Sequence, residues 1–179
     1  MLNNLLKGMR MKKLIIGLVA TLTFATSAFA AVGDSSADLV FTPVTPCRIL
    51  DTRGTGARTG LMAAASTRLF YGISSTNNFP GQGGSSPNCN VLFSVDVAAL
   101  VLNFTVVTPS TGGYITAYPS DAATRPLAAT VNFAAGAVVG NNATLKIEQT
   151  TGNGGFNIYT TSDTHVVADV VGYYAKPRP

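Results

Sequence analysis

The residues of this chain with the greatest potential for chemistry lie in one short stretch, "TPCRILDTRGTG" (45–56). It contains a thiol at Cys47, a carboxylate at Asp51, and guanidinium groups at Arg48 and Arg53. A thiol near charged groups can act as a nucleophile, and a carboxylate beside an arginine can serve in acid–base chemistry. The same residue types also form disulfides and ion pairs that only stabilise a fold.

Cys47 and Cys89 are the two cysteines of the chain, 42 residues apart. In an exported protein a single disulfide is the first interpretation, worth about 4 kcal/mol for a loop of this length. The alternatives are a nucleophilic cysteine or a metal ligand. His165 is the only histidine, and the aspartates are scattered without a calcium-loop motif. We therefore predict no metal site and no cofactor.

Asp169 lies in the apolar run "HVVADVVGYY" (165–174). An unpaired carboxylate in such surroundings costs several kcal/mol, so we expect a partner from the early strand, either Arg48 or Arg53. We predict a structural network of Arg48, Asp51, Arg53 and Asp169 that ties the first strands to the last. The alternative is an acid–base pair in a cleft.

The alternation of side chains along a strand assigns these residues to faces. In segment 47–53 it places Asp51 and Arg53 on one face and Arg48 on the other. In segment 165–174 it places Tyr173 on the face of Asp169.

Val, Ile, Thr, Phe and Tyr dominate short segments bounded by Gly, Pro, Asn and Ser, a pattern typical of strands. About ten strands are predicted, at 38–42, 47–52, 67–73, 91–96, 99–107, 114–119, 129–133, 143–149, 156–160 and 165–174. This pattern predicts an all-β fold, an antiparallel β-sandwich or jelly-roll-like domain with one disulfide. The uncharged segment 74–88 is predicted to be a flexible surface loop.

The first 30 residues resemble a secretory signal peptide, with a basic start, the apolar run "LIIGLVATLTF", and "AFA" before a cleavage point after Ala30. We then expect a flexible N-terminal arm (31–37), one β-sandwich domain (38–175) and a tail (176–179). The predicted location is secreted, extracellular or at the cell surface.

Cleavage changes the charge balance of the chain. Four of the twelve Lys and Arg residues leave with the signal peptide, and the eight that remain equal the eight acidic residues in number. A neutral mature chain gives no support for a basic surface that binds nucleic acid. We predict no nucleic-acid partner and no membrane insertion after cleavage.

Four motifs occur in order: "TPCRILDTR", "LNFTVVTPSTGGYITAYP", "NFAAG" and "HVVADVVGYY". Together they resemble a β-domain that recurs in secreted bacterial proteins and has no established activity. The resemblance covers about 135 residues, nearly all of the mature chain. One departure is "CNVLF" after the second cysteine, where the family often has C-G-(V/I)-P. The resemblance implies an exported accessory or surface module.

From these features we expect a non-catalytic extracellular structural or interaction module, with a second copy of itself as one partner through homo-oligomers or fibres. The alternative is a module that binds a cell-wall glycan or exopolysaccharide, with Tyr114, Tyr118 and Tyr159 as candidate ligand contacts. The residual alternative is a hydrolase built on His165 with Asp169 or Asp163. No motif marks a serine nucleophile, so we predict no catalytic residues and no enzyme.

Overall fold

The computed structural model describes residues 38–73, 78–85, 88–92 and 94–177. The predicted signal peptide (1–30), the predicted arm (31–37) and the end of the predicted tail (178–179) lie outside the described residues. Within the described ranges, no helix is both long and apolar enough to cross a bilayer.

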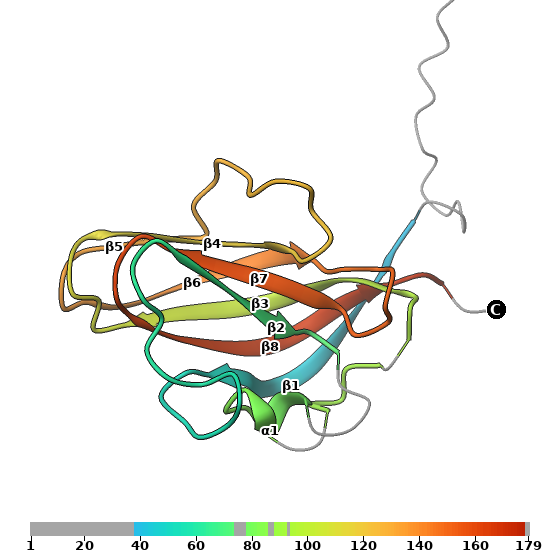
Figure 1. Cartoon of the computed structure of the whole chain (residues 1–179). Coiled ribbons are helices and arrows are strands. Elements are labelled where there is room, and N and C mark those ends of the chain that lie inside the picture. Colours follow the sequence, from blue (N-terminus) through green and yellow to red (C-terminus); the bar gives the residue numbers. More distant parts are fainter. Residues whose placement is uncertain (1–37, 74–77, 86–87, 93, 178–179) are drawn as a thin grey trace, which may run out of the picture.

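The described residues form eight strands and one short helix (Figure 1). The strands are β1 (Val40–Asp51), β2 (Ser66–Tyr71), β3 (Val97–Val107), β4 (Gly113–Pro119), β5 (Val131–Phe133), β6 (Val138–Lys146), β7 (Gly155–Thr160) and β8 (His165–Ala175). The helix α1 (Asn78–Gly81) follows β2. The predicted all-β class is therefore confirmed.

The strands form two four-stranded antiparallel sheets, with the order β1-β8-β3-β6 in the first sheet and β2-β7-β4-β5 in the second. The first four strands pair with the last four in reverse order: β1 pairs with β8, β2 with β7, β3 with β6, and β4 with β5. This pairing gives the eight-stranded double-sheet arrangement of a jelly roll. The predicted antiparallel, jelly-roll-like sandwich is confirmed.

The predicted number of ten strands is wrong, for two reasons. Segments 38–42 and 47–52 belong to one strand, β1, which continues through two prolines. Segment 91–96 has the composition of a strand but forms no strand among its described residues. Its Ser94 hydroxyl donates to Asp96 (2.8 Å) and accepts from the Asp96 N–H (3.1 Å), so a local turn satisfies groups that a ladder would use.

The core lies between the two sheets and is rich in phenylalanine. Phe104 of β3 and Phe156 of β7 are fully buried, and their ring centroids lie 6.4 Å apart in an edge-on arrangement. The ring centroid of Phe70 in β2 lies 6.0 Å from that of Phe156. These contacts join residues of both sheets, as expected for strands that bury one face each.

The prediction of a flexible surface loop at 74–88 is wrong for its described residues. Phe79 and Gln82 are fully buried, and the Gln82 amide donates to the Ile49 carbonyl (2.8 Å) and accepts from the Tyr71 N–H (3.0 Å). Gln82 thereby links β1 of the first sheet to β2 of the second. Gly83 has φ of +80°, and a Cβ there would lie 2.0 Å from the Asp51 carbonyl oxygen. Only glycine allows the segment to approach β1 this closely.

Candidate functional site

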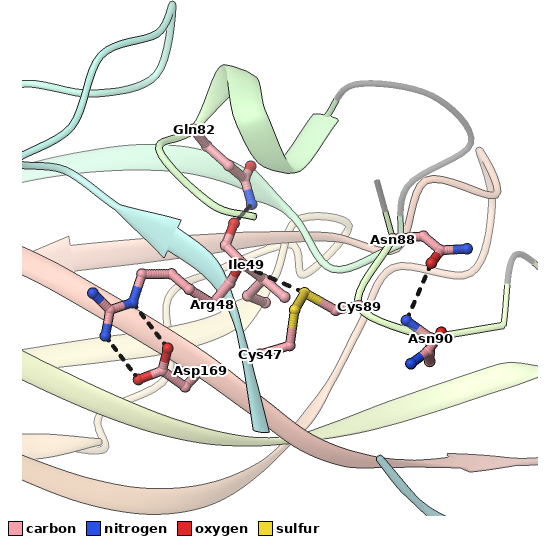
Figure 2. Close-up of a disulfide and its surroundings, with 8 residues drawn as sticks. All are labelled: Cys47, Arg48, Ile49, Gln82, Asn88, Cys89, Asn90 and Asp169. Atoms are coloured by element: carbon pink, nitrogen blue, oxygen red, sulfur yellow. Dashed lines mark hydrogen bonds and ion pairs between the residues drawn. A yellow bond between two sulfur atoms is a disulfide. The ribbon is translucent and has the colours of Figure 1, made fainter. Parts of the chain in front are cut away.

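The predicted disulfide between Cys47 and Cys89 is confirmed (Figure 2). Cys47 lies in β1, and Cys89 follows the buried segment that packs along the same strand. Cys89 and Asn90 both have positive φ, and the Asn88 side chain accepts from the Asn90 N–H (3.1 Å) to hold this turn. The sulfur of Cys47 is therefore part of a cross-link that joins the segment covering β1 to that strand.

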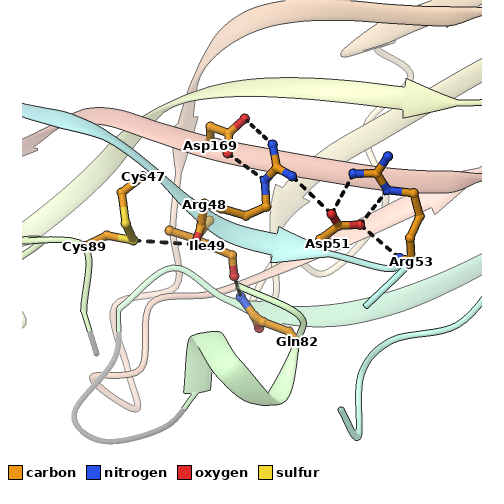
Figure 3. A network of polar contacts seen from close by, with 8 residues as sticks. All are labelled: Cys47, Arg48, Ile49, Asp51, Arg53, Gln82, Cys89 and Asp169. Atoms are coloured by element: carbon orange, nitrogen blue, oxygen red, sulfur yellow. Dashed lines mark hydrogen bonds and ion pairs between the residues drawn. A yellow bond between two sulfur atoms is a disulfide. The ribbon is translucent and has the colours of Figure 1, made fainter. Parts of the chain in front are cut away.

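The four predicted charged residues form one continuous network (Figure 3). Arg48 donates two hydrogen bonds to the Asp169 carboxylate, from Nε (2.9 Å) and from Nη2 (3.2 Å). Its Nη1 donates to Asp51 (3.1 Å), and Arg53 donates to both oxygens of Asp51 at 2.9 and 2.7 Å. Asp169 belongs to β8, so Arg48 connects the first strand with the last.

The placement of Arg48 on the face opposite Asp51 is wrong, because β1 is irregular. The pairing of β1 with β8 shifts between Arg48 and Leu50, and both Ile49 and Leu50 are fully buried. A β-bulge of this kind interrupts the alternation of side chains. It turns Arg48 toward the same side of the strand as Asp51, which makes the three-way contact feasible.

Hydrogen bonds within the network favour the charged forms of Arg48 and Asp51. The hydrogen bond from Arg53 lowers the pKa of Asp51, and the hydrogen bond to Asp169 raises the pKa of Arg48. The side chains are partly open to solvent, with Arg48 38% exposed and Asp169 25% exposed. Carboxylates that accept from guanidinium groups in this way are poor proton acceptors near neutral pH. These contacts join β1 to β8 through their side chains as well as through the ladder.

A second bulge changes the faces predicted for the last strand. Relative to β3, the pairing of β8 shifts so that Val101 faces Gly172 and Leu102 faces Val170. Val171 has no partner in this pairing, so the side chains that follow it point to the opposite faces from those that strict alternation predicts. Tyr173 is therefore buried in the core, and the prediction that it shares the face of Asp169 is wrong.

The residues proposed for a hydrolytic site are engaged in other contacts. The Nδ1 atom of His165 lies 3.0 Å from the Thr52 hydroxyl, which also accepts from the Val166 N–H (2.9 Å). Asp169 binds Arg48, and Asp163 accepts from the Ala64 N–H (2.6 Å). In the described part of the chain, no three His, Cys, Asp or Glu side chains are grouped so that they could hold a metal ion.

The three predicted tyrosines gather on the outer surface of the second sheet, around β4 and β7. Tyr114 and Tyr118 alternate with buried Ile115 on β4, and Thr116 of β4 pairs with Tyr159 of β7. The ring centroids of Tyr114 and Tyr159 lie 6.3 Å apart. Tyr118 is only 8% exposed, so it supports this surface more than it presents itself to a ligand.

Arg125 completes this group, which we call the tyrosine face (Tyr114, Tyr118, Tyr159 and Arg125). It lies in the long connection between β4 and β5, the gold loop at the top of Figure 1. Its guanidinium carbon is 3.9 Å from the Tyr159 ring centroid, and its Nη1 is 3.5 Å from the Tyr114 hydroxyl. The hydrogen bond to Tyr114 raises the pKa of Arg125. Tyrosine and arginine are enriched among the residues that dominate binding at protein–protein interfaces.

The sequence interpretation missed Arg125, although the chain carries a signal for it. It is the only Lys or Arg between Arg68 and Lys146, in a connection otherwise rich in alanine. An isolated cation in such a loop indicates a specific contact.

Comparison with known proteins assigns no family. No family model matches the chain, and no curated protein or solved structure matches it.

Proposed function

We propose that this chain is an exported, non-catalytic interaction module that binds a glycan outside the cell or at the cell surface. The observation that carries the proposal is the tyrosine face, where Tyr114, Tyr159 and Arg125 meet on the outside of one sheet. Tyrosine rings offer apolar faces to sugar C–H groups, while phenol and guanidinium groups bind sugar oxygens.

The export part of the proposal rests on the signal-peptide pattern of residues 1–30 and on the disulfide. Disulfides persist mainly in oxidising compartments outside the cytosol. The non-catalytic part rests on the engagement of Asp51, Asp169 and His165 in contacts that hold the fold.

A glycan array tests the proposal with the mature chain (31–179). We expect saturable binding to at least one cell-wall or exopolysaccharide structure, and we expect it to be lost in the Tyr114→Ala/Tyr159→Ala double variant. Tyr174→Ala is the matched control, because Tyr174 packs against Phe41 on the other sheet. The proposal fails if the mature chain binds no glycan, or if the double variant binds as well as the control.

Self-association is a second candidate, favoured by exposed apolar residues at the start of the first sheet. Leu39, Val40 and Phe41 are 41%, 52% and 44% exposed. Val40 borders a shallow, mostly apolar groove of about 390 Å³ together with Leu92 and Tyr173. Exposed apolar groups next to an edge strand favour contact with another copy.

Light scattering after size exclusion, over a range of concentrations, tests self-association. We expect the mature chain to exceed the mass of a monomer and Val40→Asp/Phe41→Asp to return it to that mass. Leu61→Asp is the control, since Leu61 is 53% exposed in a different part of the molecule. A mature chain that is monomeric at every concentration contradicts this candidate.

A further inference from the structure

A groove of about 350 Å³ lies beside the tyrosine face, where β2 and β4 end and β7 begins. Its lining includes Leu69, Tyr71, Ser120, Asp121, Glu148 and Gly155. This volume falls within the range of sites for small ligands. The lining combines carboxylates and a hydroxyl with an aromatic ring.

The groove continues the tyrosine face along the same strands. On the outer side of the second sheet, Asn157 pairs with Leu69 of β2 and with Tyr118 of β4. Two residues earlier on β7, Gly155 pairs with Tyr71. The distance along β7 from Tyr159 to Gly155 is about 13 Å at the usual rise per residue. An extended ligand on the tyrosine face can therefore reach the groove.

Gly155 keeps the groove open. A Cβ at this position would lie 2.5 Å from the Ser120 hydroxyl oxygen and 3.4 Å from a methyl group of Leu69. Both neighbours line the groove, so any side chain at 155 would project into the space between them. Ser120 can rotate away from a new side chain, and position 155 is outside the left-handed region, so a larger residue is tolerable there.

The groove is lined by two carboxylates, and the hydrogen bonds around one of them, Glu148, favour its ionised form. Glu148 is only 4% exposed, and its carboxylate accepts from the N–H and hydroxyl groups of Thr150 and Thr151. Burial raises its pKa, but these hydrogen bonds outweigh burial and lower the pKa to about 2. Asp121 adds an exposed carboxylate. The Tyr71 hydroxyl accepts from Arg58 (2.8 Å), which leaves the phenol proton available for a ligand.

We infer that this groove binds one uncharged sugar residue of the glycan, with a sugar hydroxyl donating to the exposed carboxylate of Asp121. The inference rests on the proposed function, since the groove extends the tyrosine face. Hydrogen bonds from hydroxyls to carboxylates are among the stronger neutral–ionic contacts. A uronic acid in the same place would bring its own carboxylate against two others, so the groove disfavours acidic sugars.

Calorimetric titration of the mature chain tests this assignment with linear pentasaccharides of glucose, mannose and N-acetylglucosamine, and with a pentasaccharide of galacturonic acid. We expect binding to at least one uncharged pentasaccharide and weaker binding to the acidic one. Gly155→Val should weaken the binding by at least about tenfold, because it fills the groove. Asp121→Ala, at an exposed position that leaves the fold intact, should cost about tenfold through one lost charge-assisted hydrogen bond.

Gly81→Val is the matched control, because a Cβ at Gly81 meets nothing within 4 Å. If the pentasaccharide binds and both Gly155→Val and Asp121→Ala bind it unchanged, the groove assignment is wrong while the glycan function stands. Preference for the galacturonic acid chain also overturns the assignment. If no pentasaccharide binds and the glycan array is also negative, the proposed function and the groove assignment fail together.

Discussion

Replacing Asp169 with alanine tests whether the charged network stabilises the fold. The substitution removes two hydrogen bonds from Arg48 at 2.9 and 3.2 Å, while Arg48 keeps its contact with Asp51. Hydrogen bonds to charged groups contribute about 1.5–3 kcal/mol, and fully exposed pairs contribute less than about 1 kcal/mol. Because the two side chains are partly exposed, we expect a loss of about 2 kcal/mol. That corresponds to a melting temperature lower by roughly 6 °C.

Urea unfolding of the oxidised mature chain measures this loss, with Arg48→Ala and the double variant completing a thermodynamic cycle. We expect a coupling energy of about 1 kcal/mol between Arg48 and Asp169. Arg53→Ala should cost only about 0.5 kcal/mol, because Arg53 is 47% exposed and, among the described residues, its guanidinium donates to Asp51 alone. A coupling energy indistinguishable from zero would refute the reasoning. So would full stability of Asp169→Ala combined with loss of glycan binding.

Three further outcomes follow from the same structure. Removing the disulfide with Cys47→Ala/Cys89→Ala should lower the free energy of unfolding by about 4 kcal/mol in denaturant titration, and an unchanged midpoint would contradict this. Gln82→Leu should cost about 3 kcal/mol, because buried backbone groups of β1 and β2 lose their partners; a loss below about 0.5 kcal/mol would show that water replaces the amide. Folding lowers the pKa of Asp51 and Glu148, the latter to about 2. The free energy of unfolding should therefore be constant above pH about 4.5 and fall as the pH approaches 2. Unfolding at a series of pH values measures this, and the fall should be less steep in Glu148→Gln.

The sequence predicted the class of the fold because the class depends on repeated local patterns, but it did not predict which strands pair. Buried Ala168 and Val170 alternate with the partly exposed Asp169 and Val171, which marks a half-buried strand. The side of the sheet on which the side chains after Ile49 and Val171 lie could not be predicted. Each of these residues forms a β-bulge, which depends on the partner strand and leaves no signature in composition. Strand composition at 91–96 was likewise overridden by the turn between Ser94 and Asp96.

The candidate site was predictable in part. Residue type alone selected Tyr114, Tyr118 and Tyr159, because tyrosine rings can pack against sugars. The pairing of β4 with β7, which places Tyr114 near Tyr159, could not be predicted. Arg125 and Glu148 were not predicted as members of a site. Arg125 reaches Tyr159 from a long connection whose path no periodicity describes, and Glu148 lines the groove through the turn at Thr150 and Thr151.

Mapping the bound ligand on the protein tests the central claim most directly. Amide resonances of the mature chain would be followed in nitrogen–proton spectra during titration with the tightest-binding glycan from the array. The proposed function predicts shifts concentrated at Tyr114, Arg125 and Tyr159 on the second sheet, with the resonances of Asn103 and Asn142 on the outer side of the first sheet unchanged. Shifts centred on the first sheet, or no shifts at saturating glycan, would contradict it.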